Sequence, residues 1–194
     1  MFQCRQVVLL VCCALLLPAG IQAQQSSPVN CREALRPILL QVEPDRTQLP
    51  DIRDLCQGQA DAGDPDALYQ LALLHLGLLD WRPESAIPMI RRAAVAGIPE
   101  AQYWLAWQYE SGPLLANESG SALYWYRAAG DQEHRLALNR LIEIYSRGEL
   151  GEAVDEKLAA GYRVRLANCM QQEANLSDGA LRDPAVSTRA PSAD

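Results

Sequence analysis

The chain has 194 residues, of which 24 are acidic and 17 are Lys or Arg, so its formal net charge is -7. Hydrophobic residues make up 49% of it, which excludes disorder of the whole chain and is enough for the core of one domain. The acidic balance argues against nucleic acid or an anionic membrane surface as the main partner, because both would repel the protein.

The first 23 residues have the pattern of an export signal. One basic residue, Arg5, precedes an apolar run over 7–17, and a small residue, Ala23, is followed by a polar start at Gln24. The run is too short for a hydrocarbon core of about 30 Å, which needs roughly 20 apolar residues. We expect 1–23 to be a signal peptide cleaved near Ala23, giving a periplasmic or secreted protein. The alternative is a single N-terminal anchor.

The next segment, 24–61, is expected to hold a linker and a capping hairpin of two helices. These helices are predicted over 30–42 and 51–62, with prolines between them. Cys31 falls in the first helix and Cys56 in the second, so a disulfide between them would lock the hairpin in an oxidising compartment.

Residues 62–161 contain an internal repeat with two helix patterns. The first pattern places an Ala, a Leu and an aromatic side chain four positions apart before a Gly, which marks one face of a helix and its end. Its copies begin 34 and 36 residues apart and are Ala67, Leu71, His75 and Gly77; Ala101, Leu105, Tyr109 and Gly112; and Ala137, Leu141, Tyr145 and Gly148. Helix pairs at this period predict an α-solenoid; the alternative is an Ala-rich helical bundle.

The second pattern follows each copy of the first. Its Ala pairs let neighbouring helices approach closely, and its large side chains fill the space beside them. The copies are Ala86, Met89-Ile90, Ala93-Ala94 and Gly97; Ala122, Trp125-Tyr126, Ala128-Ala129 and Gly130; and, more weakly, Ala153, Ala159-Ala160 and Gly161. We expect each of these glycines to take a positive φ where the helix ends.

This alternation resembles the Sel-one-like repeat (SLR) family, a relative of the tetratricopeptide repeat. Segment 101–112 is similar to the family's first helix, Ala-x-x-x-Leu-Gly-x-x-Tyr-x-x-Gly, with Ala106 at the first Gly place. Segment 86–97 is similar to its second helix, Ala-x-x-Trp-Tyr-x-x-Ala-Ala-x-x-Gly, and Trp125-Tyr126 matches the aromatic pair. The resemblance implies an all-α solenoid of about nine helices in a right-handed superhelix, and a scaffold that binds other proteins.

The end of the chain is expected to close the solenoid, since an open end would expose apolar side chains. Residues 162–175 predict a closing helix with apolar Val164 and Leu166, and the polar segment 176–194 predicts a disordered tail. Cys169 is either a small buried side chain or the partner of another cysteine, in this chain or in a second molecule.

Two positions on the first helices predict a binding surface. A helix turns by about 100° per residue, so in the second repeat these positions point away from the packing arc. The residues that share them in the three repeats are expected to line the concave side: Tyr69, Leu73, Tyr103, Trp107, Asn139 and Glu143. An aromatic stripe at this spacing favours docking of a protein; the alternative is packing against a neighbouring helix.

The sequence contains no pattern of a catalytic or metal site. Nucleophile motifs and glycine-rich phosphate loops are missing, and the two histidines are far apart. His75 occupies a packing position, and His134 lies in a polar run that predicts a solvated turn, with pH sensing as the alternative. We therefore expect no catalysis, no cofactor and no metal.

Three functional hypotheses follow from these patterns. The leading one is a periplasmic scaffold or adaptor whose concave face docks another envelope protein. A second is a secreted effector or inhibitor that binds a host or competitor protein. A third is a structural piece that assembles end to end.

Overall fold

The computed structural model describes residues 30–41 and 46–181, so the predicted signal peptide lies outside the described residues. These ranges form α-helices with one 3-10 turn and no sheet, which confirms the all-α prediction. The elements are α1 (Cys31–Leu39), the turn η1 (Arg46–Gln48), α2 (Leu49–Asp61), α3 (Pro65–Leu74), α4 (Pro83–Val95), α5 (Pro99–Glu110), α6 (Ser119–Asp131), α7 (Arg135–Arg147) and α8 (Glu156–Leu181).

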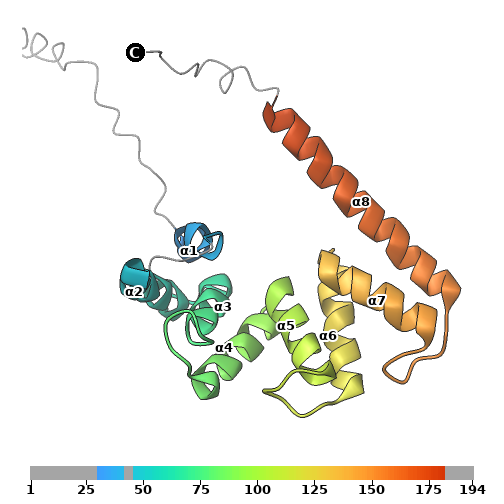
Figure 1. Cartoon of the computed structure of the whole chain (residues 1–194), viewed down its shortest axis with the longest axis horizontal. Coiled ribbons are helices and arrows are strands. Elements are labelled where there is room, and N and C mark those ends of the chain that lie inside the picture. The colour runs from blue at the N-terminus through green and yellow to red at the C-terminus, as the bar shows by residue number, and fades with distance from the viewer. Residues whose placement is uncertain (1–29, 42–45, 182–194) are drawn as a thin grey trace, which may run out of the picture.

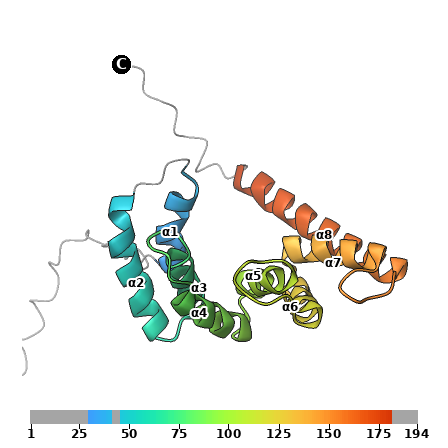
Figure 2. The same ribbon diagram turned by 60° about the horizontal axis from the view of Figure 1, so that its bottom comes forward.

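The helices follow one another along an open arc, as Figure 1 and Figure 2 show. From α2 to α8 each helix contacts the next one, while α1 contacts both α2 and α3. The helices that pack together are therefore neighbours in sequence. This is the arrangement of an α-solenoid and not of a bundle around one centre. Within the described part of the chain, no helix has both the length and the hydrophobicity needed to cross a bilayer.

Short polar and glycine signals set the helix ends. The Asp64 carboxylate accepts the backbone N–H of Asp66 at 2.9 Å and of Ala67 at 3.3 Å, which caps α3. Gly63 and Gly97 end α2 and α4 with φ values of 95° and 98°, and a proline two residues later starts the next helix.

One backbone hydrogen bond recurs in every repeat. The carbonyl of the aromatic residue near the end of the first helix accepts the N–H of the residue just before the second helix. The distance is 2.8 Å in each case, from Arg82 to His75, from Glu118 to Tyr109 and from Asp155 to Tyr145. The bonded residues are 7, 9 and 10 positions apart in the three repeats, and this bond returns each second helix to the same starting point.

The second helix of repeat two corrects one expectation from the sequence. Gly130 lies inside α6 and does not end it, and the residue with positive φ is Glu133, at 61°. The small pair is thus Ala129 with Gly130, and Glu133 occupies the place that Gly97 has in repeat one. Gly130 must be small because a Cβ there would lie 2.6 Å from a methyl carbon of Leu141.

The C-terminal region differs more from the prediction. A second helix ending at Gly161 and a separate closing helix over 162–175 were expected, but α8 runs through both and continues to Leu181. No proline follows Gly161 as it follows Gly63 and Gly97, and the apolar positions continue in helical spacing along the side that packs on α7. The first residues of the predicted tail, 176–181, belong to α8, and 182–194 lie outside the described residues.

Candidate protein-interaction surface

The first helices of the three repeats, α3, α5 and α7, carry the six residues of the predicted stripe. Trp107 has 42% of its surface exposed. Asn139 and Glu143 are also exposed, whereas Leu73 and Tyr103 are half-buried. The structure thus presents an accessible aromatic and polar surface over α5 and α7.

Tyr69 differs from the rest of the stripe because it is only 9% exposed. It packs into a core cluster with Ala72 and Ile90, at the end of the arc where α1 contacts α3. Burial, helped by the carboxylate of Glu100, raises the pKa of Tyr69 to about 12. Its equivalents in the other repeats are less buried, since Tyr103 is half-buried and Asn139 is exposed.

Tyr103 lies between two rings from neighbouring helices. Its ring centroid is 4.8 Å from that of His134, in a stacked geometry, and 5.9 Å from that of Tyr126. The polar run predicts a solvated turn around His134, but the structure does not place it in one. It is the N-cap of α7, and its Nδ1 accepts the Ala137 N–H at 3.3 Å.

Arg140 connects α5, α7 and the loop after α7, next to Glu143 of the stripe. Its guanidinium donates to the carboxylate of Glu110, with Nε 3.0 Å from Oε1. It also forms ion pairs with the carboxylates of Glu149, at 2.6 Å, and Glu143, at 2.8 Å. Tyr126 donates its hydroxyl to Glu110 at 2.7 Å. Burial raises the pKa of Glu110, but the bonds from Arg140 and Tyr126 outweigh it and hold the pKa below its ordinary value. This network fixes Glu143 relative to α5.

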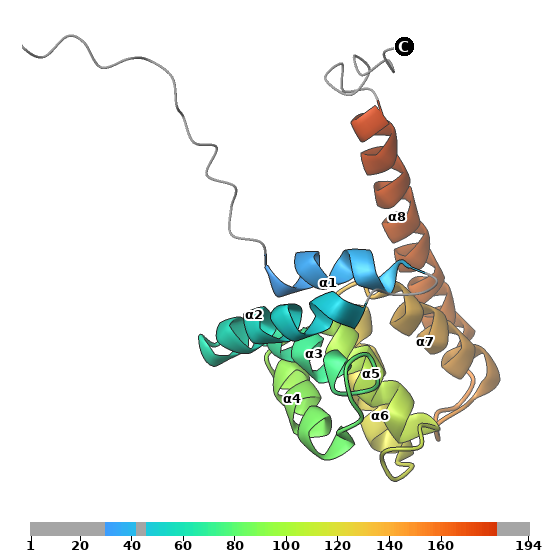
Figure 3. The ribbon, with the colours of Figure 1, turned by 60° about the vertical axis from the view of Figure 1, so that its left-hand side comes forward.

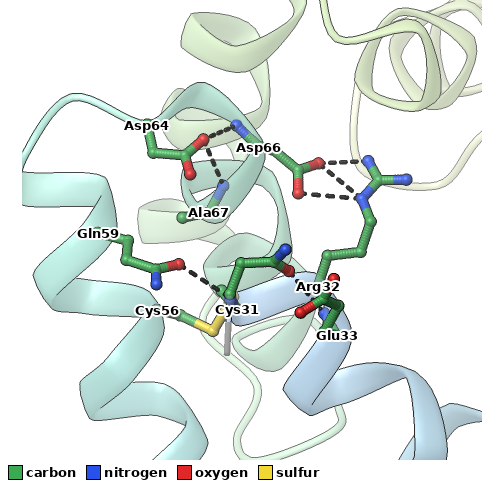
Figure 4. The surroundings of a disulfide bond; sticks show 9 residues. Cys31, Arg32, Glu33, Cys56, Gln59, Asp64, Asp66 and Ala67 are labelled. Atoms are coloured by element: carbon green, nitrogen blue, oxygen red, sulfur yellow. Dashed lines mark hydrogen bonds and ion pairs between the residues drawn. A yellow bond between two sulfur atoms is a disulfide. The ribbon is translucent and has the colours of Figure 1, made fainter. Parts of the chain in front are cut away.

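At the other end of the arc, the predicted disulfide between Cys31 and Cys56 is confirmed, with their Cα atoms 4.9 Å apart. Figure 4 shows it joining α1 to α2, and Figure 3 shows α1 lying against α2. The bond places Arg32 beside two carboxylates. Arg32 Nε lies 3.0 Å from each oxygen of Asp66, and a terminal nitrogen lies 2.6 Å from Glu100. The spacing of these three residues follows the repeat period of 34 from 32 to 66 to 100.

The remaining sequence candidates have structural roles. His75 is buried, and its Nδ1 lies 2.7 Å from Asp80 Oδ1, which confirms a satisfied core position. Cys169 is a free, half-buried thiol beside α7, and its Sγ lies 3.1 Å from Glu133 Oε2. Among the described residues, no group of three or more His, Cys, Asp or Glu side chains could hold a metal ion.

Sequence reasoning missed two contacts between repeats. The guanidinium of Arg91 lies over the ring of Tyr109, 5.4 Å from its centroid, and donates to its hydroxyl. Arg127 makes the same two contacts with Tyr145, at 5.6 Å. Arg91 and Arg127 occupy the same place in successive second helices, and the signal was their shared offset of 18 residues to a tyrosine.

The family of the chain follows from its overall fold. No protein-family model matches the sequence, and no curated protein sequence does. Among solved structures, the chain is similar to the crystal structure of a Sel1 repeat protein from Oxalobacter formigenes, with 30% identity and a TM-score of 0.56 over 65% of this chain and 98% of that one. It also shares its fold with a protective antigen present in uropathogenic Escherichia coli strains that displays an SLR fold, at 24% identity and a TM-score of 0.53 over 68% of this chain and 29% of that longer one.

The first of these relatives is aligned over nearly its whole length. Together with the recurring Tyr and His carbonyl bonds, this similarity shows that the chain belongs to the Sel1 repeat proteins.

Proposed function

We propose that this protein is an exported scaffold or adaptor that binds another envelope protein through the stripe on α3, α5 and α7, and that it performs no catalysis. The observation that carries the proposal is the exposure of Trp107. A large aromatic side chain on a first helix is normally used for packing, yet 42% of this one is open to solvent.

The surroundings of Trp107 suit a docking site. Tyr103 lies one turn earlier on the same helix and is held by its stack on His134, so it offers a rigid ring edge at low entropic cost. Aromatic side chains of this kind supply most of the binding energy at many protein interfaces. Asn139 and Glu143 extend the surface with polar groups, and polar groups are typical of an interface rim.

Two features support export. The first 23 residues have the sequence pattern of a signal peptide. The disulfide between Cys31 and Cys56 suits an oxidising compartment such as the periplasm or the medium. The alternative is a secreted effector or inhibitor that binds a host or competitor protein, which the same surface would serve.

The test is site-specific photo-cross-linking in the host cell, with the cross-linker at the exposed rim position 139, followed by identification of the attached protein. Trp107→Ala is expected to reduce the cross-linked product by at least about tenfold, the loss typical of a truncated hot-spot side chain. The matched control is Trp81→Ala, because Trp81 is 62% exposed and lies outside the stripe. Thermal unfolding of both variants checks that the fold is kept.

Equal cross-linking by Trp107→Ala and the parent protein would contradict the docking role of the stripe. Recovery of the protein mainly from the culture medium would contradict the periplasmic adaptor and favour the secreted effector or inhibitor.

A further inference from the structure

A pocket of about 410 Å³ lies where α1, α3 and α5 meet, next to the buried end of the stripe. Its volume is in the range of small-ligand sites. Arg32 and Glu100 form part of its lining and bond each other, so their charges are used within the protein. The remaining lining consists of three polar residues, Arg36, Tyr69 and Gln70, and two leucines, Leu39 and Leu73.

Two of the polar lining residues are mostly buried and make no side-chain hydrogen bond within the described part of the chain. Gln70 is 4% exposed and Tyr69 is 9% exposed, and both line the pocket. Neither side chain makes a hydrogen bond to any residue that the structure describes. No side-chain nitrogen or oxygen of the described residues is both fully buried and without a hydrogen-bond partner, so the polar atoms of Gln70 and Tyr69 are accessible. Their amide and hydroxyl groups can therefore bond a polar group that enters the pocket.

A third polar group in the lining carries charge. Arg36 lies one turn after Arg32 on α1 and lines the same pocket. Within the described residues its guanidinium makes no ion pair, whereas Arg32 bonds both Asp66 and Glu100. A cation beside a hydroxyl and an amide is a suitable receptor for a carboxylate, which accepts all three kinds of donor.

The leucines form the apolar part of the pocket. Leu39 of α1 is 49% exposed and Leu73 of α3 is half-buried. Each lies three residues after a polar lining residue of its own helix, Leu39 after Arg36 and Leu73 after Gln70. The apolar and polar parts of the pocket are therefore separated by about one helical turn, roughly 5 Å, the distance between neighbouring side chains of a peptide.

We propose that this pocket binds a segment of a partner protein in which an acidic side chain is followed by a large apolar one, such as Glu-Leu. The carboxylate bonds Arg36, Gln70 and Tyr69, and the apolar side chain packs on Leu39 and Leu73. This rests on the proposed function, because the pocket extends the docking stripe and selects which segment of the partner is bound there.

The experiment is an NMR titration of the 15N-labelled mature protein, with the disulfide intact, using the blocked peptide acetyl-Gly-Glu-Leu-Gly-amide. We expect saturable shifts of the Gln70 side-chain amide signals, and at least about tenfold weaker binding of the isosteric Gln-Leu and of the Lys-Leu peptides. Arg36→Ala is expected to weaken binding of the Glu-Leu peptide by a similar factor. Arg92→Ala is the matched control, because Arg92 also lacks an ion pair within the described residues but lies on α4, away from this pocket.

Several results would overturn the proposal: no shift at Gln70, equal binding of the Glu, Gln and Lys peptides, or unchanged binding by Arg36→Ala. Tighter binding of acetyl-Gly-Gln-Leu with a free C-terminus would also reject it and assign the pocket to a chain terminus. If these results occur while Trp107-dependent cross-linking persists, the pocket proposal fails and the scaffold function stands. Peptide binding without any cross-linked protein keeps the pocket and contradicts the adaptor.

Discussion

Tyr103 and His134 stack on each other with their ring centroids 4.8 Å apart. Tyr103 belongs to the stripe on α5, and His134 caps the N-terminus of α7, so the docking surface and the start of the next repeat share one contact. Burial lowers the pKa of His134, although Glu100 acts in the opposite direction. The cap requires a neutral imidazole because a protonated Nδ1 cannot accept the Ala137 N–H.

The stability of the protein should therefore depend on the protonation of His134. A lowered folded-state pKa means that the unfolded chain takes up its proton first as the pH falls. The stabilising contribution is complete above about pH 6.5, the ordinary pKa of histidine, and is lost as the pH falls toward the folded-state value. His134→Asn keeps a capping acceptor without this titration. We expect the stability difference between parent and variant, measured by urea unfolding, to shift in favour of the variant from pH 7.5 to pH 5. A constant difference would contradict this role.

Removal of the disulfide should loosen one end of the arc only. The Cys31→Ala, Cys56→Ala double variant is expected to lose about 3 kcal/mol of unfolding free energy, since the bond closes a loop of 25 residues. Hydrogen exchange should increase first in α1, which is held by this bond and by the ion pairs of Arg32. Protection in α7 should stay as it is. Equal loss of protection in α1 and α7 would show that the chain unfolds as one unit.

Two helical glycines should respond to alanine with opposite signs. At Gly130 a Cβ would lie 2.6 Å from Leu141, whose side chain is fully buried, so Gly130→Ala is expected to destabilise by about 1–3 kcal/mol. At Gly161 a Cβ has nothing within 4 Å, and Gly161→Ala should stabilise α8 by about 0.5–1 kcal/mol. Thermal and chemical unfolding of the two variants measures both effects. Destabilisation by Gly161→Ala would argue against an uninterrupted α8.

The Glu110 carboxylate should contribute more to the stability of the fold than exposed acidic residues do. Glu110→Gln weakens its bonds to Arg140 and Tyr126 and is expected to cost about 1–3 kcal/mol, the range for hydrogen bonds to charged groups. Because its folded-state pKa is lowered, the contribution is present above about pH 4.3 and is lost as the pH falls below it.

Glu156→Gln is the control for this effect. Its pair with Arg163 is exposed on both sides, so its loss should change stability by less than about 1 kcal/mol. Urea unfolding of both variants at pH 7 and pH 4 separates the two cases. Equal effects of the two substitutions would contradict the network around Arg140.

Helical periodicity predicted part of the stripe correctly and missed another part. Helical periodicity placed Trp107, Asn139 and Glu143 on an accessible face, and the structure has them exposed. It could not show that Tyr69 is buried, because Tyr69 packs against Ile90 of α4 and Leu105 of α5, which only the packing of separate helices brings together. The pocket beside Tyr69 was missed for the same reason, since Arg36 and Gln70 meet only when α1 packs on α3.

The sequence by itself determined the paired helices, their period and the disulfide, because these follow from local spacing of small, large and cysteine residues. Only the tertiary structure decided where the second and third repeats end. Gly130 and Gly161 close the same repeat pattern as Gly97, although no proline follows them; Gly130 is needed for the close approach of Leu141, and α7 offers a packing surface along which α8 continues past Gly161. A glycine permits a helix to end, and contacts with a neighbouring helix determine whether it does.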